Sequence, residues 1–247
     1  MPPLIAMPEP ISDRADYNER ALPQYIQAVQ EAGGEVRIIP LGATPEEAVR
    51  IAAECDAALL PGSPADVDPE KYEAKRDYRT ASADALRELT DALVLQAAFG
   101  QRKPVLGICY GLQSLNVWRS GTLVQHIDSL VNHEAGRAVA RAHKIKVAPL
   151  SRLAAILSSG GATSAPMVAG GLVTDVNSSH HQSAAVVGEG LRAVATCTED
   201  AVIEAIEGTA PDHFVLAVQW HPERTTDTEE SSRAIFRAFI QAANERR

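Results

Sequence analysis

The N-terminal half of the chain alternates short apolar runs with longer stretches whose apolar residues recur at helical spacing. This alternation predicts strands joined by crossover helices, and therefore a mostly parallel sheet that is covered on both faces. The reactive residues of such a sheet lie at the carboxyl ends of its strands. We predict strands at residues 4–7, 35–39, 57–60 and 105–108, and helices at residues 18–32, 45–53 and 83–99.

The C-terminal half has strand-like runs with few helical stretches between them, which predicts an antiparallel extension of the sheet. These strands are predicted at residues 145–147, 173–176, 191–196, 202–206 and 214–219. An amphipathic helix is predicted at residues 231–244, and residues 158–171, which are rich in Gly, Ser and Ala, are predicted to form a surface loop. The predicted fold class is therefore α/β, with a mostly parallel central sheet flanked by helices and an antiparallel extension.

Cys109 follows the apolar run at residues 105–108 and precedes a helical stretch that starts at Gly111. Gly107 and Gly111 flank it as the small residues of a Gly-x-Ser-x-Gly nucleophile elbow flank the serine, which lets the backbone turn sharply. The positive end of the helix is expected to lower the pKa of the thiol, and we expect Cys109 to be the exposed, reactive cysteine of the chain. The alternative interpretation is a buried structural cysteine.

His221 is the candidate base for such a nucleophile. The apolar run at residues 214–218 leads to it, and Pro222 then ends the strand. The carboxylate of Glu223 can turn back to hold one ring nitrogen, which leaves the other nitrogen to accept the thiol proton. A histidine before a proline is by itself more often structural, but Cys109, His221 and Glu223 together supply a complete nucleophilic triad.

Composition narrows the range of partners. The 247 residues are 45% hydrophobic, which suffices for one sizeable α/β core, and we expect a single domain over residues 1–247. The formal net charge of −9 argues against nucleic acid and membrane surfaces as partners. The dispersed cysteines and the absence of a signal-peptide pattern lead us to expect a cytoplasmic enzyme that acts on a small molecule. Whether the chain forms a homo-oligomer is left open.

Several motifs occur in a fixed order along the chain. They are Gly-Ile-Cys-x-Gly-x-Gln-x-Leu-Asn at residues 107–116, Gly-Thr-Leu-x-Gln at 121–125, Asn-Ser-x-His-His-Gln at 177–182, Val-Ile-Glu-Ala-Ile at 202–206 and Gln-Trp-His-Pro-Glu at 219–223. With these motifs the sequence resembles the class I glutamine amidotransferase-like superfamily and, within it, the peptidase C26, gamma-glutamyl-gamma-aminobutyrate hydrolase family. The resemblance implies a flavodoxin-like fold and a catalytic triad of Cys109, His221 and Glu223.

The resemblance also implies an oxyanion hole, in which backbone N–H groups bind the developing negative oxygen. Tyr110, the residue after the nucleophile, supplies one donor. The family's second loop typically reads Pro-Gly-Gly-Gly-Asp, whereas residues 61–66 here are one residue longer and poorer in glycine. Gly62 and Ser63 are the candidate donors, while Pro64 has no N–H and stiffens the loop. A simple turn is the alternative interpretation of this loop.

Candidate substrate-binding residues follow from the same resemblance. Gln113 lies one helical turn beyond the nucleophile and is implied to contact the amino-acid end of a γ-glutamyl group. Ser178, Ser179 and His180 are implied to lie beside its α-carboxylate. The pair His180 and His181 is not expected to bind a metal, because no third ligand is seen to cluster with it. No cofactor is expected.

The predicted function is cysteine-dependent hydrolysis of a γ-glutamyl amide through a γ-glutamyl thioester. The substrate resembles γ-glutamyl-γ-aminobutyrate, and the products are glutamate and an amine that the sequence does not identify. The alternative is a glutaminase subunit that supplies ammonia to a separate synthetase. A third hypothesis, a non-catalytic sensor of glutamine or a γ-glutamyl compound, is disfavoured by the complete triad.

Overall fold

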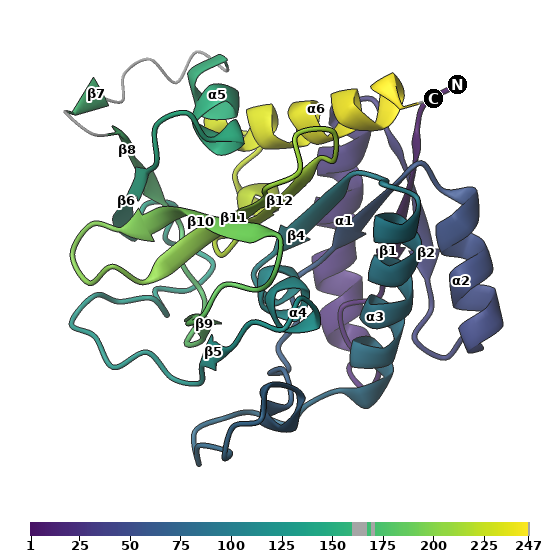
Figure 1. The fold of residues 1–247 in the computed structure, drawn as a ribbon, viewed down its shortest axis with the longest axis horizontal. Helices are drawn as coiled ribbons and strands as arrows, with labels where there is room; N and C mark the ends of the chain where they lie inside the picture. Colours follow the sequence, from purple (N-terminus) through teal and green to yellow (C-terminus); the bar gives the residue numbers. More distant parts are fainter. Residues whose placement is uncertain (160–166, 169–170, 247) are drawn as a thin grey trace.

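A mixed β-sheet runs through the centre of the molecule (Figure 1). The computed structural model describes residues 1–159, 167–168 and 171–246. The strands are β1 (Leu4–Pro8), β2 (Glu35–Ile39), β3 (Ala57–Leu60), β4 (Val105–Ile108), β5 (Leu123–Val124), β6 (His143–Val147), β7 (Met167–Val168), β8 (Gly171–Val176), β9 (Ser183–Ala184), β10 (Leu191–Cys197), β11 (Ile203–Gly208) and β12 (Val215–Val218). The helices are α1 (Ala15–Glu31), α2 (Pro45–Glu54), α3 (Ala85–Gly100), α4 (Tyr110–Trp118), α5 (Arg152–Ser159) and α6 (Glu230–Glu245), with short 3-10 helices η1 (Pro69–Tyr72) and η2 (Pro222–Arg224).

The sheet has a parallel half and an antiparallel half. Its described strands lie in the order β2-β1-β3-β4-β12-β11-β10-β6-β8-β7, and β5 pairs with β9 in a separate small sheet. The pairings among β2, β1, β3, β4 and β12 are parallel. The pairings among β12, β11, β10, β6, β8 and β7 are antiparallel. The predicted fold class is confirmed. One detail is wrong, because β12 was assigned wholly to the antiparallel extension but pairs in parallel with β4 on its other side.

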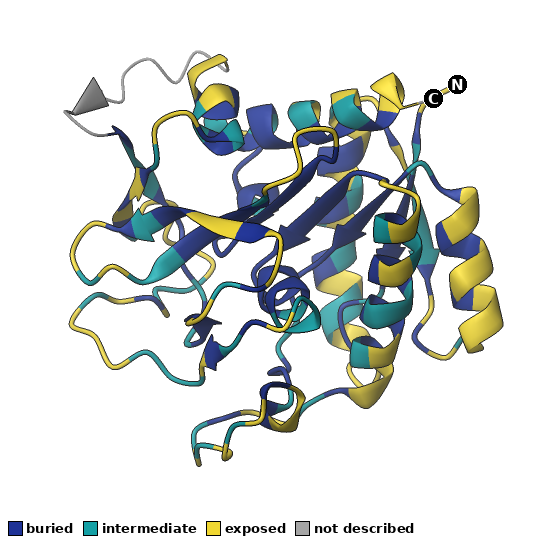
Figure 2. Ribbon diagram, in the orientation of Figure 1, coloured by how far each residue is buried: buried dark blue, intermediate teal, exposed yellow. Residues whose placement is uncertain are grey.

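Side chains from the two faces of the sheet enter two separate cores, because successive residues of a strand point to opposite faces. Ile5 and Met7 pack in a core with α1, α5 and α6, while Ala6 between them packs with α2, α3 and α4. Figure 2 shows the central strands buried and the outer faces of the helices exposed. No helix in the described part of the chain is long and apolar enough to cross a membrane.

The predicted bounds of β2, β3 and β4 are confirmed, whereas α5 was not predicted. Ser151 precedes α5, and its Oγ accepts a hydrogen bond from the Ala154 N–H at 3.0 Å, which is an N-cap signal that the sequence carries. Glu207 on β11 completes the cap by accepting from the backbone of Arg152 and Leu153. The predicted loop at residues 158–171 lies largely outside the described residues, and its first two residues belong to α5.

Candidate active site

Cys109 occupies the sharp turn between β4 and α4, as the elbow motif predicts. Its backbone has φ 54° and ψ −106°, in the positive-φ region that residues with a side chain seldom adopt. A Cβ at Gly107 would lie 2.8 Å from the Gly111 carbonyl oxygen, and one at Gly111 would lie 2.2 Å from the Leu60 carbonyl oxygen. Both flanking glycines are therefore required by the close approach of neighbouring backbone.

The expectation of an exposed thiol with a lowered pKa is wrong. Cys109 is only 6% exposed, and all three cysteines are buried. Burial raises the pKa of the Cys109 thiol to about 12, although the charge of Arg224 and a hydrogen bond from the Tyr110 backbone act in the opposite direction. The resting thiol is therefore protonated at neutral pH. Attack on a substrate then requires a neighbouring base that removes the proton.

His221 has the properties of that base. It follows β12, and the backbone N–H of Cys109 donates to the Val218 carbonyl oxygen at 2.8 Å, so the two strand ends are held side by side. The His221 Nδ1 lies 2.7 Å from Glu223 Oε1. Burial lowers the pKa of His221, against the opposing attraction of Glu223, so that the imidazole is neutral at neutral pH. A neutral ring that donates from Nδ1 keeps a free electron pair on Nε2.

Glu223 is ionised. Burial acts to raise its pKa, but the attraction to His221, the hydrogen bond with His221 and the charge of Arg224 together leave the pKa below the ordinary value. It can therefore fix the tautomer of His221 and balance the charge of the imidazolium.

Gly62 shows that the nucleophile and the base are adjacent. A Cβ on this residue would lie 2.9 Å from His221 Cε1 and 3.6 Å from Cys109 Cβ, so the loop after β3 passes against both. The Gly62 N–H, a candidate oxyanion donor, donates to the Tyr25 hydroxyl oxygen at 3.0 Å. Tyr25 lies on α1 and is buried, and the sequence analysis gave it no role. Its hydroxyl hydrogen is left free to turn toward a bound ligand.

The other oxyanion candidates are placed by a buried cation. Arg87 on α3 is fully buried and pairs with Asp91 at 2.7 Å. Its Nη2 donates to the Pro61 carbonyl oxygen at 2.6 Å, and its guanidinium lies 4.7 Å from the centre of the Tyr110 ring. Arg87 therefore connects the loop that contains Gly62 to the residue that follows the nucleophile. Ser63 lies in the same loop, and its Oγ accepts from the Ala65 N–H at 3.1 Å.

The candidate substrate-binding residues divide into two groups. Gln113 is buried on α4, with Nε2 3.3 Å from the Gln182 carbonyl oxygen, and Ser179 accepts a hydrogen bond from Arg224 at 2.8 Å. Ser178 and His180 instead contact the segment around His133. The Ser178 Oγ and the His180 N–H both donate to the His133 carbonyl oxygen. Among these contacts, the one between Ser179 and Arg224 reaches the segment that carries the triad.

Two residues near the triad were missed by the sequence analysis. Asn177 accepts a hydrogen bond from the His221 N–H and donates to the His221 carbonyl oxygen, at 2.9 and 2.8 Å, so it fixes the backbone of the base. Arg224 follows Glu223, with Nε 3.5 Å from Glu223 Oε1, and its side chain is 9% exposed. Asn177 belongs to a motif that was identified, but its contact joins residues that are far apart in the chain. Arg224 had no local signal.

The expectation that no further ligand gathers near His180 is also wrong for the described residues. His133, His143 and Glu204 come together with potential ligand atoms within 4.8 Å of one another, and His180 Nε2 lies 3.5 Å from Glu204 Oε1. We call these four residues the histidine cluster. It lies in the antiparallel half of the molecule, and no side chain of the triad belongs to it.

Comparison with known proteins identifies the family of this chain. Residues 4–223 match the peptidase C26 family. A protein of Mycobacterium tuberculosis, named provisionally as a glutamine amidotransferase, is 34% identical over 223 residues, which cover 89% of this chain and 66% of that protein, slightly less than two thirds of its length. Gamma-glutamyl-gamma-aminobutyrate hydrolase PuuD of Escherichia coli K12 is 32% identical over 230 residues, which cover 89% of this chain and 84% of PuuD.

Solved structures of low sequence identity share the fold. A Thermoplasma acidophilum protein, named provisionally as one of the subunits of GMP synthase, has a TM-score of 0.62 and 14% identity, with 99% of this chain and 96% of that chain covered. The glutaminase domain of CTP synthase from Trypanosoma brucei, solved with acivicin, has a TM-score of 0.60 and 17% identity, with 98% and 94% covered. The family match and the relatives above 30% identity show that this chain belongs to the peptidase C26 family of glutamine amidotransferase-type hydrolases.

Proposed function

We propose that this chain hydrolyses a γ-glutamyl amide through a thioester on Cys109. The observation that carries the proposal is the packing of Gly62 against both His221 and Cys109, together with the 2.7 Å contact between His221 and Glu223. These contacts support a buried site that contains a protonated thiol, a neutral imidazole and a carboxylate. That is the set of groups that acyl transfer by a cysteine requires.

In the first half-reaction His221 accepts the thiol proton while the Cys109 sulfur attacks the γ-carbonyl carbon. The carbon–sulfur bond forms, the carbonyl electron pair moves to oxygen, and Glu223 stabilises the imidazolium. The tetrahedral intermediate then collapses as the carbon–nitrogen bond breaks. His221 returns its proton to the departing amine, which leaves a γ-glutamyl thioester and a neutral ring.

In the second half-reaction a water molecule takes the place of the amine. His221 accepts one proton from the water as its oxygen attacks the thioester carbonyl. The carbon–sulfur bond breaks, the proton passes to the sulfur, and glutamate is released with the thiol restored. The same neutral base therefore serves both steps.

We propose that the oxyanion is stabilised by the Tyr110 N–H and by the loop that contains Gly62 and Ser63. The Gly62 N–H already donates to Tyr25, so the carbonyl oxygen must either displace that hydroxyl or bind beside it. In the second arrangement the Tyr25 O–H becomes a further donor, because its oxygen is occupied and its hydrogen is free to rotate.

Arg224 and Ser179 are proposed to bind the α-carboxylate of the γ-glutamyl group. Their contact of 2.8 Å joins the end of the triad segment to the polar segment after β8. The Arg224 Nη1 donates to Ser179 and its Nε lies 3.5 Å from Glu223 Oε1, so the guanidinium is held at the end of the triad segment, where its positive charge can attract an anionic ligand. A γ-glutamyl substrate carries such a carboxylate whatever amine is attached.

A glutaminase subunit is the second candidate, because the relative from Mycobacterium tuberculosis carries the provisional name of a glutamine amidotransferase. Both candidates share the thioester. They differ in the amine that leaves, which is ammonia for a glutaminase and a larger amine for a hydrolase that resembles PuuD.

The test compares γ-glutamyl-γ-aminobutyrate, γ-glutamyl-p-nitroanilide and glutamine as substrates of the isolated chain. We expect kcat/KM for γ-glutamyl-γ-aminobutyrate to exceed that for glutamine by about tenfold or more. Acid quenching and peptide mass analysis are expected to find the γ-glutamyl group on Cys109. Rapid cleavage of glutamine without cleavage of the other two substrates would favour the glutaminase. Turnover of any substrate without a thioester on Cys109 would overturn the mechanism.

Arg224→Gln tests the carboxylate site. We expect KM to rise by roughly tenfold for both γ-glutamyl-γ-aminobutyrate and γ-glutamyl-p-nitroanilide, since both contain the α-carboxylate. Arg20→Gln is the matched control, because Arg20 forms an exposed ion pair with Asp16 on α1. An effect confined to γ-glutamyl-γ-aminobutyrate would show that Arg224 binds the leaving amine instead.

A further inference from the structure

The histidine cluster brings three histidines from separate segments of the chain onto one carboxylate oxygen. Glu204 Oε1 lies 3.3 Å from His133 Nδ1, 3.0 Å from His143 Nε2 and 3.5 Å from His180 Nε2. Each of the four residues is buried. The cluster is not part of the triad, and the proposed reaction gives it no role.

In His133 and His180, the ring nitrogen that points away from Glu204 determines whether the nitrogen that faces Glu204 carries a proton. His180 Nδ1 lies 2.9 Å from the Gln182 carbonyl oxygen, which can only accept, so this nitrogen carries the proton of a neutral ring. His133 Nε2 lies 2.9 Å from Asp200 Oδ2, which requires a proton in the same way. The remaining nitrogens, His133 Nδ1 and His180 Nε2, then present electron pairs to the Glu204 carboxylate.

This arrangement leaves buried acceptors facing one another. His133 Nδ1, His180 Nε2 and Glu204 Oε2 have no hydrogen-bond partner in the described structure, although all are shielded from solvent. Neutral imidazole nitrogens and a carboxylate repel one another unless a positive charge lies between them. That charge is either a bound cation or a proton on a ring, because Glu204 and Asp200 raise the pKa of His133 against the effect of burial. A cation at the centre of the cluster would remove this conflict.

The separations from Glu204 Oε1 fit a tetrahedral metal, and the potential ligand atoms of His133, His143 and Glu204 all lie within 4.8 Å of one another. Nitrogen and oxygen ligands at about 2.0–2.1 Å from Zn²⁺ lie about 3.3 Å from one another in a tetrahedron. The observed contacts to Glu204 Oε1 span 3.0 to 3.5 Å. Metal-binding histidines usually donate their other N–H to a carboxylate or backbone carbonyl, as His133 does to Asp200 and His180 does to Gln182.

We propose that His133, His143, His180 and Glu204 form a binding site for one Zn²⁺ ion. Imidazole and carboxylate ligands suit this borderline divalent metal. Four protein ligands fill a tetrahedral shell, which is typical of a structural rather than a catalytic zinc site.

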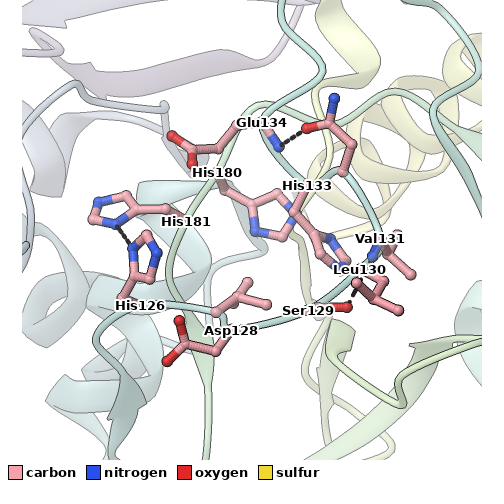
Figure 3. A pocket seen from close by; sticks show the side chains of 11 residues that line it. His126, Asp128, Ser129, Leu130, Val131, His133, Glu134, His180 and His181 are labelled. Atoms are coloured by element: carbon pink, nitrogen blue, oxygen red, sulfur yellow. Dashed lines mark hydrogen bonds between the residues drawn. The ribbon is translucent and has the colours of Figure 1, made fainter.

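A cavity of about 630 Å³ gives the ion a route to the site. Figure 3 shows His133 and His180 in the middle of its lining, while His126 and His181 form a separate pair at one side. The His126 and His181 Nδ1 atoms lie 3.1 Å apart, and His181 Nε2 contacts Asp66. These two histidines are engaged elsewhere, so they provide matched controls within the same cavity.

The site would also brace the strand that carries the base. The Glu204 carbonyl oxygen accepts a hydrogen bond from the Gln219 N–H at 2.7 Å, two residues before His221. The bound ion would join the segment around His133 to β6, to the segment after β8 and to β11. We therefore expect the metal to raise the thermal stability of the chain without entering the reaction.

The experiment uses Cys109→Ala, so that Zn²⁺ cannot bind to the catalytic thiol. The protein is stripped with EDTA and titrated with ZnCl₂ in a calorimeter, and Tm is measured with and without the ion. We expect one ion to bind per chain and Tm to rise by several degrees. X-ray absorption of the loaded protein is expected to show nitrogen and oxygen ligands without sulfur.

Adding Glu204→Gln or His143→Gln to Cys109→Ala is expected to abolish binding, whereas adding His126→Asn is expected to preserve it. Circular dichroism of each protein checks folding before the titration. The X-ray absorption spectrum of the Zn²⁺-loaded Cys109→Ala protein gives a test that needs no substitution in the histidine cluster. Failure to bind one ion at micromolar Zn²⁺ would overturn the proposal.

A competing set in the same region is His133, Cys197 and Asp200, whose potential ligand atoms also lie within 4.8 Å of one another. Cys197→Ala separates the two sets. If the ion is held by the histidine cluster, binding persists in Cys109→Ala/Cys197→Ala. Sulfur in the ligand shell, or loss of binding with Cys197→Ala, would assign the ion to the competing set and overturn our proposal.

Discussion

The parallel and antiparallel halves of the sheet assemble their polar residues in different ways. In the parallel half, Cys109 and His221 are placed by the ends of two adjacent strands, and their close neighbours in sequence complete the geometry. In the antiparallel half, the histidine cluster is assembled from segments that are far apart in the chain, and each residue depends on tertiary contacts. A polar centre built on strand ends is fixed by local backbone. One built across strands depends on the whole region.

This difference predicts where substitutions change catalysis and where they change only stability. Residues at the carboxyl ends of the parallel strands are expected to affect turnover directly. Buried polar residues of the extension that do not contact the triad segment are expected to affect the free energy of unfolding, with little effect on turnover.

Cys109→Ala is expected to have the largest effect. Hydrolysis should be abolished, because no other covalent nucleophile is proposed, while the fold is retained because alanine is smaller than cysteine. Cys55→Ala is the matched control, since Cys55 is also buried but lies in the core on the α2 and α3 face. Steady-state kinetics and circular dichroism measure both variants. Retention of a tenth of the activity by Cys109→Ala would contradict the mechanism.

Glu223→Gln is expected to lower kcat by roughly 10 to 10⁴-fold, because the amide keeps a hydrogen bond but loses the charge that stabilises the imidazolium. Its pH profile provides a second readout. The base must be neutral, and burial lowers the pKa of His221, so the acid limb of kcat/KM for the native chain should lie below about 6.5.

Glu223 opposes that shift, so removing its charge should lower the pKa of His221 further and move the acid limb to lower pH. His221→Asn should be at least as damaging to kcat as Glu223→Gln. A Glu223→Gln chain within twofold of the native kcat would reduce the triad to a pair of Cys109 and His221.

Arg87→Gln tests whether the local geometry of the parallel half depends on a buried cation. The substitution leaves Asp91 buried without its partner and removes the contact with the Pro61 carbonyl oxygen. We expect a loss of about 3–5 kcal/mol in the free energy of unfolding. Urea denaturation measures it, with Arg20→Gln as the exposed control. An equal and small effect of both substitutions would show that Arg87 contributes no more than a surface ion pair.

Glu207→Gln is the corresponding test in the extension and should have the smallest effect on catalysis. Glu207 is buried, accepts hydrogen bonds from the start of α5 and pairs with Arg192 at 2.6 Å. Loss of the charge should reduce the free energy of unfolding by about 1–3 kcal/mol and leave kcat within twofold of the native value. Urea denaturation and steady-state kinetics, measured on the same protein preparation, compare the loss of stability with the change in kcat. A fall in kcat of tenfold or more would show that the two halves are not separable.

The sequence was informative wherever structure and chemistry depend on adjacent residues. Alternation of apolar runs predicted β2, β3 and β4 to the residue, and the flanking glycines predicted the turn at Cys109. The spacing of His221 and Glu223 predicted a contact that the structure shows at 2.7 Å. Each of these features is determined within a few residues of chain.

Features that depend on tertiary burial were not predictable in this way. The pKa of Cys109 follows from how deeply the turn is covered, and this outweighs the position of the thiol at the start of α4. Arg87 looks like an ordinary helix residue until α3 packs against the loop after β3. Glu204 lies in a motif that was identified, but its partners come from segments that are distant from it in the chain.

The positive φ of Cys109 also limits which amino acids could ever serve as nucleophile at this turn. Threonine branches at Cβ, and a branched side chain at such a φ meets its own backbone, whereas serine has the same unbranched outline as cysteine. Among the small hydroxyl and thiol nucleophiles, the backbone therefore favours cysteine or serine over threonine before acidity or nucleophilicity is considered. Evolution or engineering of this site can exchange sulfur for oxygen, but it cannot adopt a threonine nucleophile without rebuilding the turn.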